Sequence, residues 1–92
     1  MKWEHALSDY KNYLRIERGL SENTFKNYVL DLKKLQRWLQ DTNADALPLT
    51  ISEEKIQEFL YHVGKTMNPR SQSRIISGLR GFFNYLVFEG YR

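Results

Sequence analysis

The 92-residue chain contains no cysteine and no long run of apolar residues. Without cysteine, disulfide bonds and thiolate metal sites are excluded, which agrees with a reducing compartment. The longest apolar run is far too short to span a bilayer. The residues that follow Met1 have mixed polarity and lack the apolar core of a signal peptide. These absences predict a cytoplasmic protein that has no contact with a membrane.

The motifs of common catalytic and metal centres are missing as well. The two histidines, His5 and His62, are far apart in the chain and do not have the spacing of metal ligands. No glycine-rich phosphate loop, serine nucleophile elbow or zincin motif occurs. None of the six tyrosines lies among the convergent Arg and His residues that nucleophilic tyrosine chemistry needs. We therefore expect no catalytic residue, no cofactor and no metal in this chain, and we disfavour a free-standing enzyme.

The chain does have helical periodicity along its length, without β-alternation, internal repeats or low-complexity segments. Its length fits one domain, and its 14% of aromatic residues suffice for a helical core. We predict an all-α fold with helices over residues 2–18, 22–41, 53–63 and 69–89 and a loop over 42–51. The predicted N-caps are Ser21, Ser52 and Asn68, and the glycines expected to end helices are Gly19, Gly64 and Gly90.

The net charge of +3 is unevenly distributed along the chain. Residues 19–38 carry +2 and residues 65–88 carry +4 with no acidic residue, whereas residues 39–64 carry −4. Two basic segments therefore flank an acidic one, and the positive charge can gather on one surface. We expect the acidic segment to turn away from that surface.

The fourth predicted helix has an apolar face and a basic face. Apolar residues lie on one side, at Ile75, Ile76, Leu79, Phe82, Phe83, Leu86 and Val87. Opposite them lie Arg70, Ser73, Arg74, Ser77, Gly81 and Asn84. Arginine forms bidentate hydrogen bonds with phosphate or guanine, and small neighbours allow a polymer to come close. The basic face indicates nucleic-acid binding, although a plain solvated face has the same pattern. Gly78 is expected to allow close helix packing, and Gly81 to allow either packing or the close approach of a ligand.

The second predicted helix has a similar polar face, made of Asn23, Lys26, Asn27, Asp31, Lys34 and Arg37. Asparagine can read adenine and lysine can bind phosphate, but a solvated face explains this pattern almost as well. Leu30 and Trp38 lie off the apolar stripe, and we expect them to pack on neighbouring helices or on a partner domain.

Two stretches of the sequence resemble a known family. Residues 19–32, GLSENTFKNYVLDL, resemble the GLSxNTxxxYxxDLxxFxxFL stretch of tyrosine recombinases of the Xer and phage-integrase type. Residues 71–86, SQSRIISGLRGFFNYL, resemble the SxxSxxRxLSALRxFFxYL stretch of the same family. The two motifs occur in the family's order and at its separation, and the resemblance covers nearly the whole chain.

The resemblance implies that residues 1–92 form an N-terminal core-binding domain, a SAM-like bundle of four or five helices in two crossed hairpins. It implies sequence-specific binding of double-stranded DNA in a nucleoid-associated recombinase. The family's catalytic domain would begin after Arg92, and the partners would be that domain and other protomers in a tetramer on DNA. We assign Asn23, Asn27 and Arg74 to base or groove-edge contacts and the basic and hydroxyl residues to phosphates. The full set of expected DNA-binding residues is Asn23, Thr24, Lys26, Asn27, Tyr28, Asp31, Lys34, Arg70, Ser71, Ser73, Arg74, Ser77 and Arg80.

Two points stay open at this stage. Asp31 could accept a hydrogen bond from a cytosine amine, or it could pair with Lys33 or Lys34 of its own helix. A helical protein-interaction module is the alternative function, since Leu30, Trp38 and Phe88 are apolar but lie off the core stripes.

Overall fold

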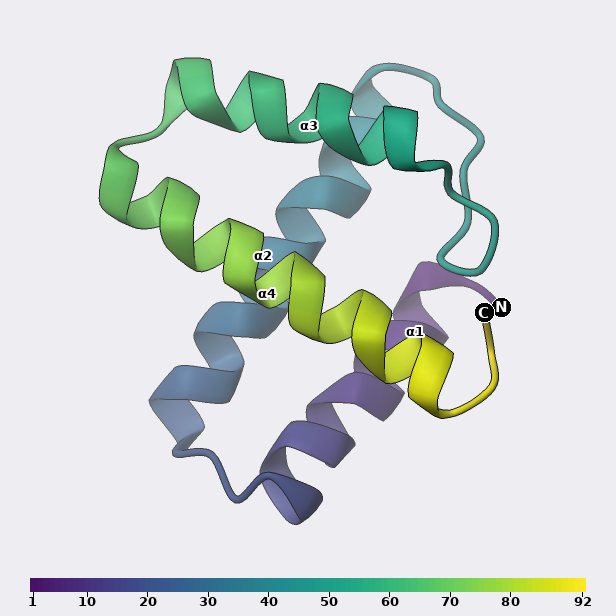
Figure 1. Cartoon of the computed structure of the whole chain (residues 1–92), viewed down its shortest axis with the longest axis vertical. Helices are drawn as coiled ribbons and strands as arrows, with labels where there is room; N and C mark the ends of the chain where they lie inside the picture. The colour runs from purple at the N-terminus through teal and green to yellow at the C-terminus, as the bar shows by residue number, and fades with distance from the viewer.

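A computed structural model describes residues 1–92, and all of its regular structure is helical. In chain order the elements are α1 (Trp3–Asn12), a π-helical turn η1 (Tyr13–Glu17), α2 (Glu22–Asp41), α3 (Glu53–Thr66) and α4 (Pro69–Phe88). The first hairpin consists of α1, η1 and α2, and the second of α3 and α4, with α4 lying across α2 (Figure 1). The prediction of an all-α bundle of two crossed hairpins is confirmed. None of the helices combines the length and the apolar character needed to traverse a bilayer.

The three predicted N-caps are confirmed by their hydrogen bonds. The Ser21 hydroxyl accepts from the backbone N–H of Thr24 at 3.4 Å, and the Ser52 hydroxyl from that of Lys55 at 3.1 Å. The Asn68 side-chain carbonyl accepts from the Ser71 N–H at 2.9 Å, and Pro69 follows at the first helical position. A cap of this kind stabilises a helix by about 1 kcal/mol. The starts of α2, α3 and α4 are therefore fixed by local sequence.

Two of the three predicted helix ends are confirmed, and the third is wrong. Gly19 and Gly90 have φ of 60° and 77°, in the left-handed region that terminates helices. Gly64, by contrast, lies inside α3, which continues to Thr66. The helical hydrogen bonding continues past Gly64, because the Met67 N–H donates to the Val63 carbonyl at 3.0 Å and Met67 packs against the core. The Gln72 side chain then donates to the Met67 carbonyl at 2.6 Å and helps to cap the end of α3.

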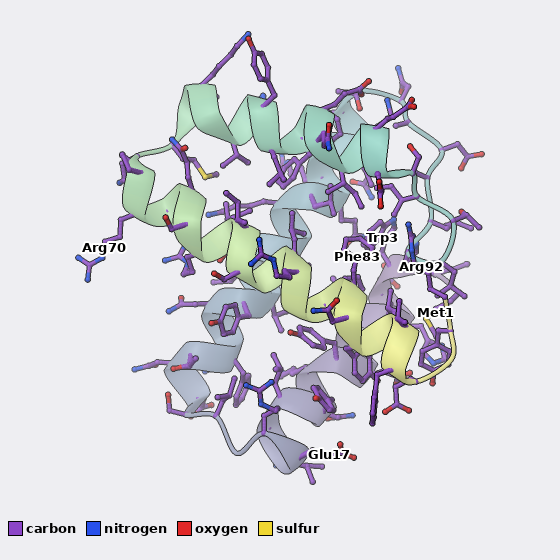
Figure 2. The ribbon with its side chains drawn as sticks, in the orientation of Figure 1. Met1, Trp3, Glu17, Arg70, Phe83 and Arg92 are labelled. Atoms are coloured by element: carbon purple, nitrogen blue, oxygen red, sulfur yellow. The ribbon has the colours of Figure 1, made fainter.

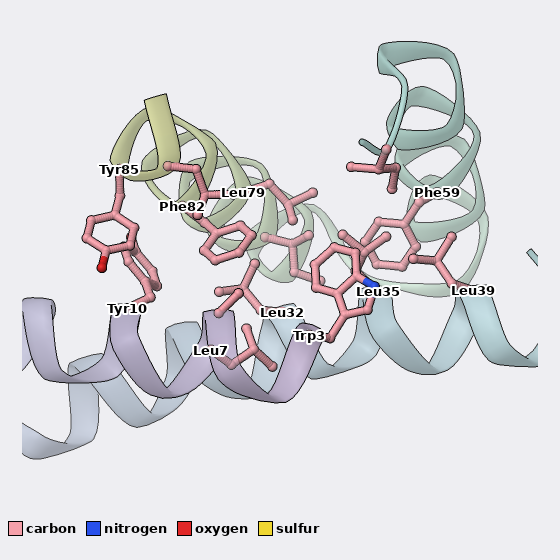
Figure 3. Packing of buried hydrophobic residues seen from close by; sticks show 14 of the residues in the cluster. Trp3, Leu7, Tyr10, Leu32, Leu35, Leu39, Phe59, Leu79, Phe82 and Tyr85 are labelled. Carbon is pink, nitrogen blue, oxygen red and sulfur yellow. The ribbon is translucent and has the colours of Figure 1, made fainter. Parts of the chain in front are cut away.

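The core lies between the hairpins, where aromatic rings of α1 meet those of α4 (Figure 3). Phe82 is fully buried, and the centre of its ring lies 6.1 Å from that of Trp3 and 5.3 Å from that of Tyr10. The Trp3 indole N–H donates to the Ala46 carbonyl at 2.8 Å, which attaches the 42–51 loop to α1. Trp38 packs on Phe59 of α3 with ring centres 5.5 Å apart, as expected for contact with a neighbouring helix.

The buried side of α4 differs from the predicted apolar face. Ile76 and Val87 are 41% and 59% exposed, whereas Gly78 and Tyr85 are buried. This shift arises because α4 packs against α2 at Gly78 and against the Tyr10 ring of α1 at Tyr85, which turns the buried side toward these two residues. The prediction was therefore wrong for Ile76 and Val87, although the centre of the buried face was placed correctly.

The two glycines inside α4 both serve helix packing. A Cβ atom at Gly78 would lie 3.1 Å from the Tyr28 ring, as expected for close contact with α2. A Cβ atom at Gly81 would lie 2.8 Å from the Tyr10 hydroxyl of α1. The space beside Gly81 is therefore filled by Tyr10, which corrects the suggestion that a ligand approaches there.

We expect Gly81→Ala to destabilise the domain by about 1–2 kcal/mol, because the clash with Tyr10 outweighs the gain in helix propensity. Denaturant unfolding measures this change. Tyr10→Phe removes the hydroxyl that the new methyl group meets, so Gly81→Ala should cost less in a Tyr10→Phe background. Strict additivity of the two substitutions would contradict this explanation.

The core also predicts loss of stability in strong alkali. Burial raises the pKa of Tyr10 and of Tyr85 from 10.0 to about 12. Because their neutral forms are favoured in the folded state, the stabilisation is complete below about pH 10 and disappears as the pH rises through about 12. We expect up to about 2–3 kcal/mol of lost unfolding free energy per tyrosine. Urea titrations across this range should show a weaker pH dependence in Tyr10→Phe than in the wild type, with Tyr61→Phe, whose ring is exposed, as the control variant.

Candidate nucleic-acid interface

An ion pair joins α2 and α4 at the point where they cross. The Arg74 Nε–H donates to Asp31 Oδ2 at 2.8 Å, and an Nη2–H donates to Oδ1 at 3.1 Å. Lys34 Nζ lies 3.5 Å from the same Oδ1. The Asp31 side chain is only 2% exposed, whereas that of Arg74 is 42% exposed. The hydrogen bond and the negative charge of Asp31 raise the pKa of Arg74 further above its ordinary value, so the guanidinium stays charged.

A basic hollow opens beside this ion pair. It has a volume of about 300 Å³ and is lined by Asn27, Leu30, Asp31, Lys33, Lys34, Arg37 and Arg74. Four of these side chains are basic, and the one acidic side chain is already bonded to two of them. The hollow therefore has an excess of positive charge and suits an anion.

The outward side of α4 carries a row of polar residues. Its exposed members are Arg70, Ser73, Ser77, Arg80 and Asn84. Arg70 extends into solvent near the first turn of the helix (Figure 2). No acidic residue of α4 interrupts the row. This surface, which we call the α4 ridge, adjoins the basic hollow through Arg74.

The expected site residues in the N-terminal parts of α2 and α4 differ in their exposure and contacts. Asn23 and Asn27 are exposed, and Lys26 pairs with Glu22 at 3.1 Å. The Thr24 hydroxyl lies 2.8 Å from that of Ser21 and takes part in the helix cap. Tyr28 is half-buried against Gly78, and Ser71 is half-buried beside its cap residue.

Comparison with known proteins places this chain in a family. The family described as "Phage integrase, N-terminal SAM-like domain" matches residues 7–90. The chain belongs to this family. It is 39% identical to the tyrosine recombinase XerD of Lacticaseibacillus casei over 84 residues, which is 91% of this chain and 28% of that protein.

Two further tyrosine recombinases match this chain to a similar extent. The tyrosine recombinases XerD of Oceanobacillus iheyensis and of Pseudomonas putida are each 37% identical over 87 residues, covering 94% of this chain and 29% of theirs. The chain thus spans less than a third of the length of these relatives and matches their SAM-like part. No solved structure matches it significantly.

Not all of the expected site residues of the SAM-like domain lie on one surface. Arg80 and Asn84 form the edge of the α4 ridge that borders α3, and they line a second hollow together with Glu53. The acidic segment therefore does not turn away completely, and that expectation is wrong at Glu53, because α3 packs alongside α4. The basic face predicted for α4 is divided as well, because Arg74 and Gly81 lie on the flank that faces α2 and α1.

Two basic residues of the hollow, Lys33 and Arg37, were not among the expected site residues. Arg37 lies one helical turn beyond Lys33, and this spacing together with their charge was a usable signal. No group of three or more His, Cys, Asp or Glu side chains in the domain could hold a metal ion.

Proposed function

We propose that this SAM-like domain binds duplex DNA sequence-specifically across α2 and α4, as the N-terminal clamp of a site-specific tyrosine recombinase that acts in DNA recombination or integration. The observation that carries the proposal is the adjacency of the basic hollow and the α4 ridge. Arginine and lysine supply charge for phosphates, and exposed asparagines supply hydrogen bonds for base edges. The names of the relatives support a role in recombination.

The roles proposed for individual residues follow from their surroundings. Asn23 and Asn27 are free to reach base edges, because both are exposed on α2. The phosphate contacts fall to exposed cations and hydroxyls, namely Lys26, Lys34, Arg70, Arg80, Ser73 and Ser77. Arg74 joins them here in place of the base-edge contact first expected of it, because it lines the basic hollow. Thr24, Tyr28 and Ser71 contribute less surface, since they are engaged in caps or in helix packing. Asp31 has almost no exposed surface, and we propose a supporting role for it in place of direct contact.

We further propose that the partners of the domain are the recombinase's own catalytic domain and neighbouring protomers in a tetramer on the cytoplasmic, nucleoid-associated DNA. Leu30 and Phe88 support contact with protein, because they are 53% and 80% exposed. Self-association at micromolar concentration without affinity for duplex DNA would favour the alternative, a protein-interaction module.

We expect Arg70→Ala and Arg80→Ala each to weaken duplex binding by about 1–2 kcal/mol, since each removes a charged donor to phosphate. Fluorescence anisotropy with a labelled duplex measures the affinity. Lys2→Ala is the matched control, because Lys2 is an exposed cation that directly follows Met1 in the chain. Figure 2 shows Met1 at the opposite side of the molecule from Arg70. An equal loss of affinity in Lys2→Ala would indicate nonspecific charge attraction and contradict the proposed surface.

A further inference from the structure

The Asp31–Arg74 pair is more than a contact between two helices. Asp31 is the one charged residue of the buried set, and its carboxylate holds Arg74 by two hydrogen bonds along one edge of the guanidinium. A guanidinium has five N–H donors in a rigid planar fork. The pair with Asp31 uses Nε–H and one Nη2–H, so both Nη1–H groups and the second Nη2–H remain available.

Arg74 lies in a basic environment. Arg74 lines the hollow together with Lys33, Lys34 and Arg37, and its side chain is 42% exposed. Two parallel N–H donors of a guanidinium match two oxygens of a phosphodiester. A flexible arginine loses rotamer freedom when it binds, whereas an arginine already held by a carboxylate has lost most of it beforehand.

We propose that Asp31 is a positioning residue that presets Arg74, and thereby makes the hollow at the α2–α4 crossing a preformed receptor for one DNA phosphodiester. This inference rests on the proposed DNA binding of the domain. It assigns Asp31 a function that its charge alone would not suggest, because an acidic residue repels DNA. The surrounding lysines and Arg37 favour a phosphate over a base edge as the ligand of Arg74.

The test compares two acid-to-amide substitutions on α2 by duplex anisotropy, at a temperature where both variants are folded by circular dichroism. Asp31→Asn and Glu22→Gln each remove one negative charge, but Glu22 is exposed and pairs only with Lys26. Charge alone predicts equal or tighter DNA binding for both. Positioning predicts that Asp31→Asn binds about three- to tenfold more weakly than the wild type, while Glu22→Gln does not weaken. Binding by Asp31→Asn as tight as by Glu22→Gln would overturn the proposal.

Arg74→Lys tests the same receptor if Asp31→Asn does not fold. It keeps the charge and can still pair with Asp31, but it lacks the planar fork. We expect three- to tenfold weaker binding with an unchanged salt dependence, and equally on A·T-rich and G·C-rich duplexes. Wild-type affinity in Arg74→Lys, or a loss confined to one duplex, would overturn the proposal.

Failure of this inference can be distinguished from failure of the proposed function. If the wild-type domain itself shows no salt-dependent binding, the proposed function fails together with this inference. If the wild type binds as expected and only the variants behave unexpectedly, the inference alone fails.

Discussion

The affinity of the domain for duplex DNA is expected to fall by roughly two to three orders of magnitude between 50 and 200 mM monovalent salt. Neutralising a phosphate releases condensed counterions, and the slope of log affinity against log salt is about −0.9 for each phosphate neutralised. The hollow and the α4 ridge together supply enough exposed cations to neutralise about four to six phosphates. Anisotropy titrations over this salt range measure the slope.

Two variants, Arg70→Ala and Lys2→Ala, test which cations determine the salt dependence. Removing Arg70, an exposed cation of the α4 ridge, should reduce the slope by about one phosphate equivalent. Lys2→Ala should leave the slope unchanged. An affinity that stays flat from low to moderate salt would show that binding does not depend on phosphates and would contradict the proposed function.

Phe82→Ala is expected to destabilise the domain by about 3–5 kcal/mol, a large part of the roughly 5–15 kcal/mol that folded domains have. Phe82 is fully buried and contacts rings from α1, so its loss leaves a cavity between the hairpins. Urea unfolding followed by circular dichroism gives the free-energy change, and a midpoint shift without a change in slope identifies a loss of stability.

Phe88→Ala is the matched control for this substitution. It makes the same chemical change in the same helix, but the Phe88 ring is 80% exposed. We expect its effect to stay within about 0.5 kcal/mol. Comparable losses in the two variants would mean that Phe82 does not occupy the centre of the core.

Features of the fold that depend on neighbouring residues in the chain were predictable from the sequence. Ser21, Ser52 and Asn68 stand directly before helices, and each makes the cap bond that its position implies. Gly64 was misjudged, because a glycine ends a helix only when the chain can turn there, and Val63 and Met67 keep this part of the chain against the core.

For the candidate site, the sequence allowed us to predict the polar faces of single helices but not the contacts between them. The charges of the second and fourth helices showed which elements could face DNA, but the pairing of Asp31 with Arg74 depends on where these helices cross. Residues 43 positions apart meet at that crossing, and no local pattern encodes such a contact. The same crossing explains why Tyr28 faces Gly78 instead of solvent.

The two glycines of α4 imply that the two sides of this helix limit amino-acid substitution for different reasons. On the flank of Gly78 and Gly81 the constraint is volume, because aromatic side chains of α1 and α2 fill the adjacent space. On the outward side, at Ser73 and Ser77, larger side chains meet only solvent, and the proposed DNA binding makes the sign of charge the constraint there. Related sequences can therefore vary along the outward side of α4 without disturbing how the two hairpins fit together on the other.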